Sequence, residues 1–224
     1  MVDLGSGMSH AVVARRHEPL NSLDDFPTPP WATRALMEHV IKPSEFGHGI
    51  QRSRVWEPAC GRGFMSRPLN EYFSSVVSTD IADYGWNGQF GSCDFASGEF
   101  EPSDFEWVIT NPPFKRAHDF INHGKRAGRS VAVLVRTSFV EGVRRFNQLY
   151  KSEPPDIIGQ FSERVPMVKG RVDKNASTAT AYCWLVWGRP EIRNDDPRTK
   201  FVWIPPCRKD LERAEDYKTE SEWR

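Results

Sequence analysis

Apolar and polar positions along the chain follow two kinds of pattern. Short runs rich in Val, Ile, Phe and Trp predict buried β-strands, and they lie at residues 53–57, 76–79, 106–110, 131–135, 157–161 and 179–187. Between them, apolar residues at helical spacing predict helices at residues 31–41, 64–73, 118–127 and 140–151. Strands that alternate with helices indicate an α/β fold, with a mostly parallel sheet and helices on both faces. In such sheets, ligands bind beyond the carboxyl ends of the strands.

The pattern and the length together predict one domain. A chain of 224 residues and 25.7 kDa fits a single domain of good size. Residues 1–23 lack periodicity and are expected to form a flexible N-terminal arm, followed by the domain at residues 24–204. Within the domain, the polar stretch 163–178 is a candidate substrate loop. Residues 205–224 are rich in charge and are expected to be a C-terminal tail, either helical or frayed.

Composition narrows the class of protein. Hydrophobic residues make up 38% of the chain and charged residues 27%, which is typical of a globular domain. No apolar stretch approaches the roughly 18 residues of a membrane span, and no secretion signal opens the chain, so we expect a cytoplasmic protein without a membrane partner. The four cysteines form no CxxC pair and the six histidines show no metal-site spacing, so neither a metal site nor a disulfide framework is expected.

The net charge of zero conceals an asymmetry along the chain. Residues 1–110 carry 8 Lys and Arg against 15 Asp and Glu, a balance of −7, whereas residues 111–174 carry 13 against 6, a balance of +7. One face built from the middle of the chain is therefore able to hold a polyanion. The alternative interpretation is an unevenly charged, solvated surface.

A glycine turn follows the first predicted strand. The string Glu57-Pro-Ala-Cys-Gly-Arg-Gly63 places two glycines between a strand and a helix, where backbone can approach a ligand closely and free N–H groups are available. Asp80 ends the second strand, 19 residues after Gly61, where a carboxylate can accept hydrogen bonds from a ribose diol. Asp94, after a turn, is a candidate to bind an adenine amino group. The alternative for either aspartate is a turn or helix-cap role.

The most informative string is Asn111-Pro-Pro-Phe114, directly after an apolar strand. Two prolines fix the backbone and remove two N–H donors, so the strand-end carbonyls and the Asn side-chain oxygen are left as acceptors. Such acceptors suit a planar amino group, and Phe114 offers a face on which a ring can stack. The alternative is a rigid loop with a buried Phe, but the order of glycine turn, Asp80 and this string favours the functional interpretation.

In this order, the motifs resemble those of S-adenosylmethionine-dependent amino methyltransferases. More narrowly, the sequence resembles the N6-adenine DNA methyltransferases, and the small phage- or prophage-type members among them, over residues 24–188. The resemblance implies a Rossmann-like sheet of seven strands, mostly parallel, with an antiparallel last strand at residues 179–187. It also implies S-adenosylmethionine as the cofactor and DNA as the partner, with RNA kept as an alternative and a homodimer left open.

The resemblance assigns roles to individual residues. The residues implied to bind the cofactor are Phe26, Thr28 and Pro29 at the methionine end, Glu57, Ala59, Gly61 and Gly63 on the floor, Asp80 at the ribose, Asp94 at the adenine, and also Ile81 and Asn111. The implied catalytic residues, which hold the target base, are Asn111, Pro112, Pro113 and Phe114. The proposed reaction is a direct in-line displacement on a flipped base, without a covalent nucleophile, so Cys207 after Pro206 is interpreted as incidental.

A DNA-binding face, on this interpretation, draws on basic residues that flank the pocket. The main candidates are Lys115, Arg116, Arg144, Arg145, Arg164, Lys169, Arg171 and Lys174. Further members of the set are Lys125, Arg126, Arg129 and Arg136. Because larger members of the family carry a separate recognition domain and this chain has only residues 163–178 and the tail for that task, we expect low or short-site specificity, or a partner that supplies it.

Two kinds of alternative stay open at the level of sequence. The first concerns the acceptor nitrogen, which on the alternatives to adenine N6 belongs to a cytosine N4, to an RNA base or to a protein glutamine, since strings like Asn111–Phe114 occur in enzymes for all of them. A protein of another class, one that keeps the fold and binds nucleic acid without catalysis, is the second hypothesis. The recognition sequence and the biological role, whether phage protection, regulation or restriction-modification, are not encoded in these motifs.

Overall fold

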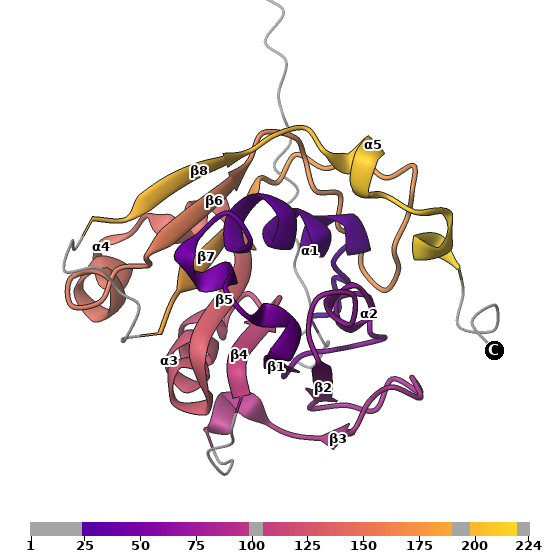
Figure 1. The fold of residues 1–224 in the computed structure, drawn as a ribbon, viewed down its shortest axis with the longest axis horizontal. Coiled ribbons are helices and arrows are strands. Elements are labelled where there is room, and N and C mark those ends of the chain that lie inside the picture. The colour runs from indigo at the N-terminus through magenta and orange to yellow at the C-terminus, as the bar shows by residue number, and fades with distance from the viewer. Residues whose placement is uncertain (1–23, 99–104, 190–197, 219–224) are drawn as a thin grey trace, which may run out of the picture.

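The computed structural model describes residues 24–98, 105–189 and 198–218. The expected N-terminal arm therefore lies outside the described residues. The described part contains an eight-stranded sheet in the order β3-β2-β1-β4-β5-β7-β6-β8 (Figure 1). The strands are β1 (Arg54–Glu57), β2 (Ser75–Asp80), β3 (Gly91–Ser92), β4 (Phe105–Thr110), β5 (Gly128–Arg136), β6 (Ile157–Phe161), β7 (Tyr182–Trp187) and β8 (Lys200–Ile204).

The strand directions confirm the expected α/β class, with one difference in the sheet. β7 runs antiparallel between β5 and β6, and every other neighbouring pair is parallel. The sheet thus has eight strands instead of the expected seven, and the antiparallel strand is not the last. β8 adds to β6 at the edge, with Gly159 opposite Val202. Its alternate residues Phe201 and Trp203 are exposed, so the apolar run of residues 201–204 is only partly buried at this edge strand.

Helices cover both faces of the sheet. The α-helices are α1 (Pro30–Leu36), α2 (Ser66–Leu69), α3 (Ala117–Ala127), α4 (Val143–Arg145) and α5 (Arg208–Leu211). Short 3-10 or π-helical segments lie at Met37–Ile41, Glu45–Gly47, Ile50–Arg52, Phe95–Ser97, Thr137–Val140, Phe146–Tyr150 and Ala214–Tyr217. Pro30 opens α1, where its fixed φ suits a helix start and its missing N–H costs no hydrogen bond. The helices expected at residues 64–73 and 140–151 are present only as shorter segments.

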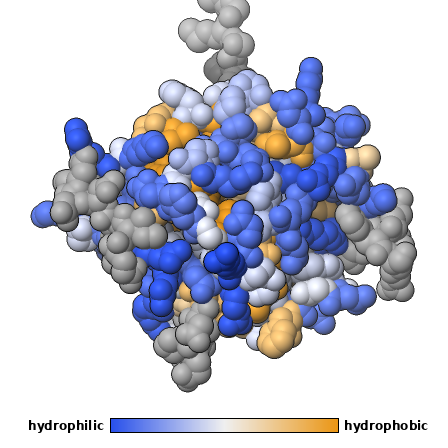
Figure 2. Space-filling model, in the orientation of Figure 1, coloured by the Kyte–Doolittle hydropathy of each residue, from blue (hydrophilic) through white to orange (hydrophobic). Residues whose placement is uncertain are grey.

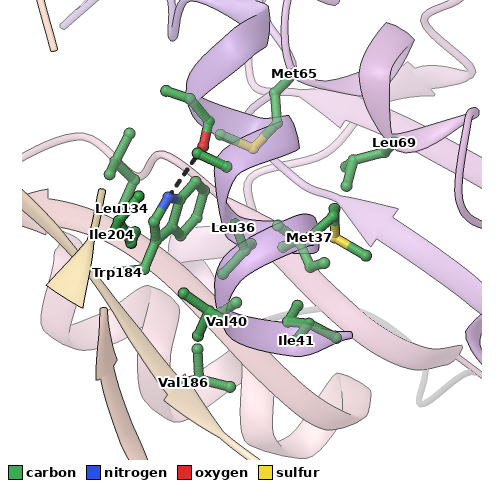
Figure 3. Packing of buried hydrophobic residues seen from close by; sticks show 14 of the residues in the cluster. Leu36, Met37, Val40, Ile41, Met65, Leu69, Leu134, Trp184, Val186 and Ile204 are labelled. Carbon is green, nitrogen blue, oxygen red and sulfur yellow. Dashed lines mark hydrogen bonds between the residues drawn. The ribbon is translucent and has the colours of Figure 1, made fainter. Parts of the chain in front are cut away.

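Successive side chains of a strand point to opposite faces of the sheet, so a hydrophobic core forms on each face. From β5, Ala132 and Leu134 pack with α1 and α2, whereas Val131, Val133 and Val135 pack with α3. Figure 3 shows the first of these cores, where the Trp184 indole N–H donates to the Ala32 carbonyl across 3.2 Å. Two-sided burial explains the uninterrupted apolar run of β5.

The C-terminal segment packs against α1. Arg34, only 4% exposed, donates to both carboxylate oxygens of Asp216, over 2.8 and 2.9 Å, and to the Leu211 carbonyl. Glu71, which follows α2, accepts from the other edge of the same guanidinium. The part of the expected charged tail that is described, up to residue 218, is therefore ordered by a buried ion pair; where the domain itself ends stays a prediction.

The surface in the orientation of Figure 1 is largely hydrophilic, with apolar side chains in small separate patches (Figure 2). Among the described residues, no helix is long and apolar enough to cross a membrane. The carboxyl ends of β1, β2 and β4 lie side by side at one edge of the sheet, since these strands are parallel neighbours. This edge brings the three sequence motifs together.

Candidate active site

An open cleft of about 890 Å³ lies at the carboxyl ends of β1, β2 and β4. Ten of the residues that the motifs singled out line it: Phe26, Thr28, Glu57, Ala59, Gly61, Asp80, Ile81, Asp94, Asn111 and Pro113. Four others do not line this cleft: Pro29, Gly63, Pro112 and Phe114. Chain segments that are far apart in the sequence therefore converge here, as expected of a parallel sheet.

The glycine turn is held by Asp80. The Gly61 N–H donates to Oδ2 of Asp80 across 2.9 Å, and the Ala82 N–H donates to Oδ1 across 3.2 Å. Gly61 has a φ of +50°, a left-handed conformation that favours glycine. Both carboxylate oxygens of Asp80 thus brace the turn around the cleft, and each keeps a lone pair for another donor. Burial raises the pKa of Asp80, while these N–H donors oppose the rise.

Gly63 makes room for an aromatic ring. It has a φ of +76°, and a Cβ at this position would lie 2.4 Å from the ring of Trp86. A Cβ on Gly88 would meet the same ring at 2.3 Å. The loop between β2 and β3 therefore docks on the glycine turn through Trp86. The same loop contributes two walls of the cleft, Tyr84 and the 57% exposed Ile81.

Glu57 is buried at the floor of the cleft, with 2% of its surface exposed. It accepts a short hydrogen bond from the Ser66 hydroxyl, which in turn accepts from Ser78 across 2.7 Å. Burial raises the pKa of Glu57 to about 8, and the nearby charge of Asp80 adds to the rise. The group is therefore protonated in the folded protein over a range in which an exposed glutamate is ionised.

Asp94 lines the cleft and also caps a helical turn. Its Oδ1 accepts from the N–H groups of Ala96 and Ser97, over 3.1 and 3.2 Å. The cap role that the sequence left as an alternative is thus present, and it does not remove Asp94 from the wall of the cleft.

A short segment before α1 joins the motifs. The Asp24 carboxylate accepts from the Phe114 N–H across 2.7 Å, and the Phe26 carbonyl accepts from the Asn111 side chain across 2.9 Å. The Arg62 guanidinium, from the glycine turn, pairs with Asp25 across 2.8 Å. Residues 24–26 therefore connect the glycine turn to the Asn-Pro-Pro-Phe loop.

The side chain of Asn111 presents its oxygen without a partner. Because the Phe26 carbonyl only accepts, the hydrogen bond between them must come from the Asn111 NH2 group, and this fixes the amide orientation. Oδ1 of Asn111 is then buried, and no described residue donates to it. Oγ1 of Thr28, which also lines the cleft, is buried without a partner among the described residues as well. Such atoms favour a ligand that supplies polar partners.

Phe114 lies beside the cleft in an aromatic group. Its ring centroid is 5.6 Å from that of Phe26 and 6.5 Å from that of Tyr182. The guanidinium of Arg136, at the end of β5, stacks on it, with Cζ 4.0 Å from the ring centroid. The ring is therefore already covered on one side.

The main basic candidates follow the carboxyl ends of strands. Lys115 and Arg116 directly follow the Asn-Pro-Pro-Phe loop, and the segment with Arg164, Lys169, Arg171 and Lys174 follows the carboxyl end of β6. The Gly170 N–H in that segment donates to the Asp25 carbonyl across 2.9 Å, which ties the segment to the cleft. Arg144 and Arg145 lie in α4, after β5.

Three of the further candidates lie away from the cleft. Arg129 is at the amino end of β5, and α3 returns to that edge with Lys125 and Arg126 in its last turn. The prediction that they lie at the carboxyl ends of the strands was wrong, because the direction of β5 places them at its amino end. Arg136, at the carboxyl end of the same strand, is on the expected side.

Sequence reasoning missed several residues around the cleft, namely Asp24, Asp25, Arg62, Tyr84 and Met167. Arg62 lies inside the glycine motif, between the two glycines that the sequence analysis singles out. The others lie in irregular segments, where no periodicity marks which side chains turn inward. Among the described residues, no group of three or more His, Cys, Asp or Glu side chains could hold a metal ion.

Comparisons with known proteins address the fold. Neither a family model nor a curated protein matches the sequence. Among solved structures, the chain is similar to a type I restriction-modification methyltransferase subunit from Streptococcus thermophilus, with a TM-score of 0.60 and 11% identity over 88% of this chain and 51% of that one. A putative RNA methyltransferase from Pyrococcus horikoshii has a TM-score of 0.57 and 15% identity, over 77% of this chain and 90% of that one.

A modification subunit of a putative type I restriction enzyme from Vibrio vulnificus is also similar, with a TM-score of 0.53 and 14% identity over 89% of this chain and 51% of that one. The chain spans about half the length of the two restriction-modification subunits. At these identities the likeness is one of fold, and the fold is the Rossmann-like α/β fold found in methyltransferases.

Proposed function

We propose that this chain transfers a methyl group from S-adenosylmethionine to the N6 amino group of adenine in DNA. The observation that carries the proposal is Oδ1 of Asn111 at the edge of the cleft, which is buried without a donor from the described residues and has its orientation fixed by Phe26. An amino group is the natural partner of such an acceptor, because it offers two N–H donors and no competing oxygen. The loop that follows Asn111 supplies Phe114 for stacking of the base.

The cleft fits the proposed cofactor. Asp80 keeps lone pairs for a ribose diol, and the exposed Ile81 beside it offers an apolar surface to a base. The hydroxyl of Thr28, which has no partner among the described residues, also lines the cleft, as does Phe26. Several polar groups and an apolar wall are what an adenosine linked to an amino acid requires. When bound, the sulfonium supplies an activated methyl group.

The residues of the chain orient and polarise the acceptor. The N6 amino group of adenine is a weak nucleophile because its lone pair is delocalised into the ring. Oδ1 of Asn111 and the Pro112 carbonyl would accept from this group and favour the pyramidal nitrogen that develops during attack. Pro112 and Pro113 keep the loop rigid, so these acceptors need no reorganisation. The base has to leave the duplex, at a cost of a few kcal/mol that stacking on Phe114 offsets in part.

The basic segments support nucleic acid as the partner. Positive charge lies at the carboxyl ends of the strands, where the cleft is. It comes from Lys115 and Arg116 next to the loop and from the exposed Arg164 and Arg171 after β6. Contacts of this kind bind phosphate without reading sequence, which agrees with low or short-site specificity. The solved structures of similar fold include a type I restriction-modification methyltransferase subunit and a putative RNA methyltransferase, so both DNA and RNA enter the test.

The test is an identification of the product. Purified protein is incubated with methyl-labelled S-adenosylmethionine and, separately, with unmethylated DNA, RNA or a protein mixture, and each polymer is digested. Label in N6-methyladenine from the DNA supports the proposal. Label found only in RNA, in N4-methylcytosine or in glutamine would show that the acceptor is not adenine in DNA. An absence of methyl transfer together with intact cofactor binding would favour a binding protein that has lost catalysis. Asn111→Ala, run in parallel, excludes a contaminating enzyme as the source of label.

A further inference from the structure

Arg136 lies next to the proposed target-base loop, and none of the described residues forms a hydrogen bond or an ion pair with its side chain. Its guanidinium stacks on Phe114, with Cζ 4.0 Å from the ring centroid. Its Nε–H is buried, and no described residue accepts from it. A buried donor without an acceptor is costly, and the cost is greater for a charged group. The stacking contact with Phe114 accounts for the position of the guanidinium but satisfies none of its N–H groups.

The surroundings of Arg136 indicate where an acceptor would come from. Arg136 pairs with Tyr182 in the sheet, so both side chains leave the same face, and the Tyr182 ring also contacts Phe114. Neither Arg136 nor Phe114 lines the cleft that fits the cofactor. A ligand that supplies the acceptor would therefore lie outside that cleft.

The guanidinium group of Arg136 favours an anion with several oxygens as its ligand. A guanidinium that stacks on a ring keeps all its N–H groups in the plane of the stack, where they can form a fork to a phosphate or carboxylate. A nucleotide whose base stacks against Phe114 brings its own phosphates to within a few ångströms of the edge of that stack.

We propose that Arg136 binds a backbone phosphate next to the target base, and that it is the phosphate contact closest to the reaction. The inference rests on the proposed function, since it takes Phe114 as the platform for the base. Arg136 thereby differs from the exposed basic residues, whose contacts add affinity at a distance from the base. It is a positioning residue, which holds the strand while Asn111 engages the amino group.

The first test measures binding and needs no methyl transfer. A fluorescent single-stranded DNA oligonucleotide with one adenine is titrated with protein in the presence of S-adenosylhomocysteine. Arg136→Gln should weaken binding by about tenfold or more. It should also reduce the slope of log affinity against log salt by about 0.7, the value for one phosphate on a single strand. Arg136→Lys should keep the salt slope and recover only part of the affinity, because an ammonium has no fork.

Arg129→Gln is the matched control. It also removes an arginine side chain from β5, but at the amino end of the strand, whereas Arg136 lies at the carboxyl end. We expect less than a twofold change in affinity. Equal effects of Arg129→Gln and Arg136→Gln, or no effect of either, would overturn the proposal. So would loss of S-adenosylhomocysteine binding in Arg136→Gln by calorimetry, since it would place Arg136 in the cofactor site or in the fold.

The second test locates the phosphate. Single neutral methylphosphonate linkages are placed in turn at each position around the adenine. One linkage should weaken binding to the wild-type protein and have no further effect on Arg136→Gln, and it should adjoin the adenine. Additive effects at every linkage would show that no phosphate is specific to Arg136. If the wild-type protein methylates adenine and these tests fail, only the role of Arg136 is lost, whereas a wild-type protein that neither binds nor methylates nucleic acid contradicts the proposed function itself.

Discussion

The side-chain amide of Asn111 donates to the main-chain carbonyl of Phe26 across 2.9 Å, and the two residues are 85 positions apart in the chain. This one contact decides which end of the amide faces the cleft. With the NH2 group held by Phe26, only Oδ1 is left to meet a ligand, and an amide held the other way would offer donors instead of an acceptor. The segment before α1 thus has a chemical role at the site as well as a structural one.

Asn111→Ala is expected to slow the chemical step by on the order of 10²–10³-fold, because it removes a preorganised polar contact that strengthens as the amino nitrogen becomes pyramidal. Cofactor affinity should change by only a few-fold. Single-turnover kinetics at saturating cofactor and calorimetry with S-adenosylhomocysteine measure the two effects separately. Asn122→Ala, at an exposed position of α3, is the control. Near-normal turnover in Asn111→Ala would remove Asn111 from the mechanism.

Asp80→Ala is expected to weaken cofactor binding by about 10- to 100-fold, since hydrogen bonds to a charged acceptor are worth about 1.5–3 kcal/mol each. The substitution leaves the Gly61 and Ala82 N–H groups without their acceptor and removes the lone pairs proposed for the ribose. Asp83→Ala is the matched control, because Asp83 caps an exposed turn of the same loop through Gly85. Calorimetry on both variants decides, and equal affinities would show that Asp80 does not face the cofactor.

Much of the site could be predicted from the chain because it lies on regular strands. Glu57, Asp80 and Asn111 each lie at or directly after the end of a parallel strand, and neighbouring parallel strands end at the same edge. The order of motifs along the chain therefore translates directly into proximity in space. The faces of β5 were predictable in the same way, from its uninterrupted apolar run.

Other features depend on packing that has no local pattern. Two alternate residues of β8, Phe201 and Trp203, are aromatic and exposed, so the strand has no division into an exposed polar face and a buried apolar face. The sequence predicts that Gly63 binds the cofactor, and this stays a prediction, but no local pattern indicates that its missing side chain accommodates Trp86 from an irregular loop. Asp216 was one charge among many in a tail, and its partner Arg34 lies 182 positions earlier. In each case the deciding contact joins segments that the sequence cannot place relative to one another.

The packing of Trp86 on Gly63 is testable as a coupling in stability. Gly63→Ala adds a left-handed backbone penalty of about 1–2 kcal/mol and a clash with Trp86. Gly61→Ala, at a φ of +50° with no atom within 4 Å of the added Cβ, should cost the backbone penalty alone. In a Trp86→Ala background the two glycine substitutions should become equally costly. Urea unfolding of the wild-type protein, the three single variants and the two double variants measures this, and strict additivity of Gly63→Ala and Trp86→Ala would contradict the contact.

Asp216→Ala is expected to lower the free energy of unfolding by about 3–5 kcal/mol, because it leaves one edge of a buried guanidinium without its partner. Arg34 and Asp216 are 4% and 3% exposed, so solvent screens their interaction weakly. Lys42→Ala is the control, since its pair with Glu38 is 44% and 32% exposed and such pairs contribute about 0.3–0.5 kcal/mol. A comparable small loss for both variants in urea unfolding would mean that the C-terminal segment does not depend on this pair.

Glu57 is expected to make the stability of the protein fall as pH rises. Burial, with the nearby charge of Asp80, raises the pKa of Glu57 from 4.5 to about 8 in the folded protein. Between these values the folded state binds a proton that the unfolded state has released, so each step up in pH favours unfolding. The contribution of Glu57 is complete below about pH 4.5 and is lost as pH passes through about 8. Across this window the loss is on the order of several kcal/mol.

Glu57→Gln isolates this contribution, because glutamine keeps an oxygen for the Ser66 hydroxyl and cannot ionise. Burial raises the pKa of Asp80 as well, but that carboxyl is present in both proteins, so it largely cancels in the difference between them. Urea unfolding at a series of pH values between about 5 and 8 should show the wild-type protein losing stability relative to Glu57→Gln as pH rises. Parallel curves for the two proteins would mean that Glu57 is ionised throughout, and a buried carboxylate would then need a cationic partner that the floor of the cleft does not supply from the described residues.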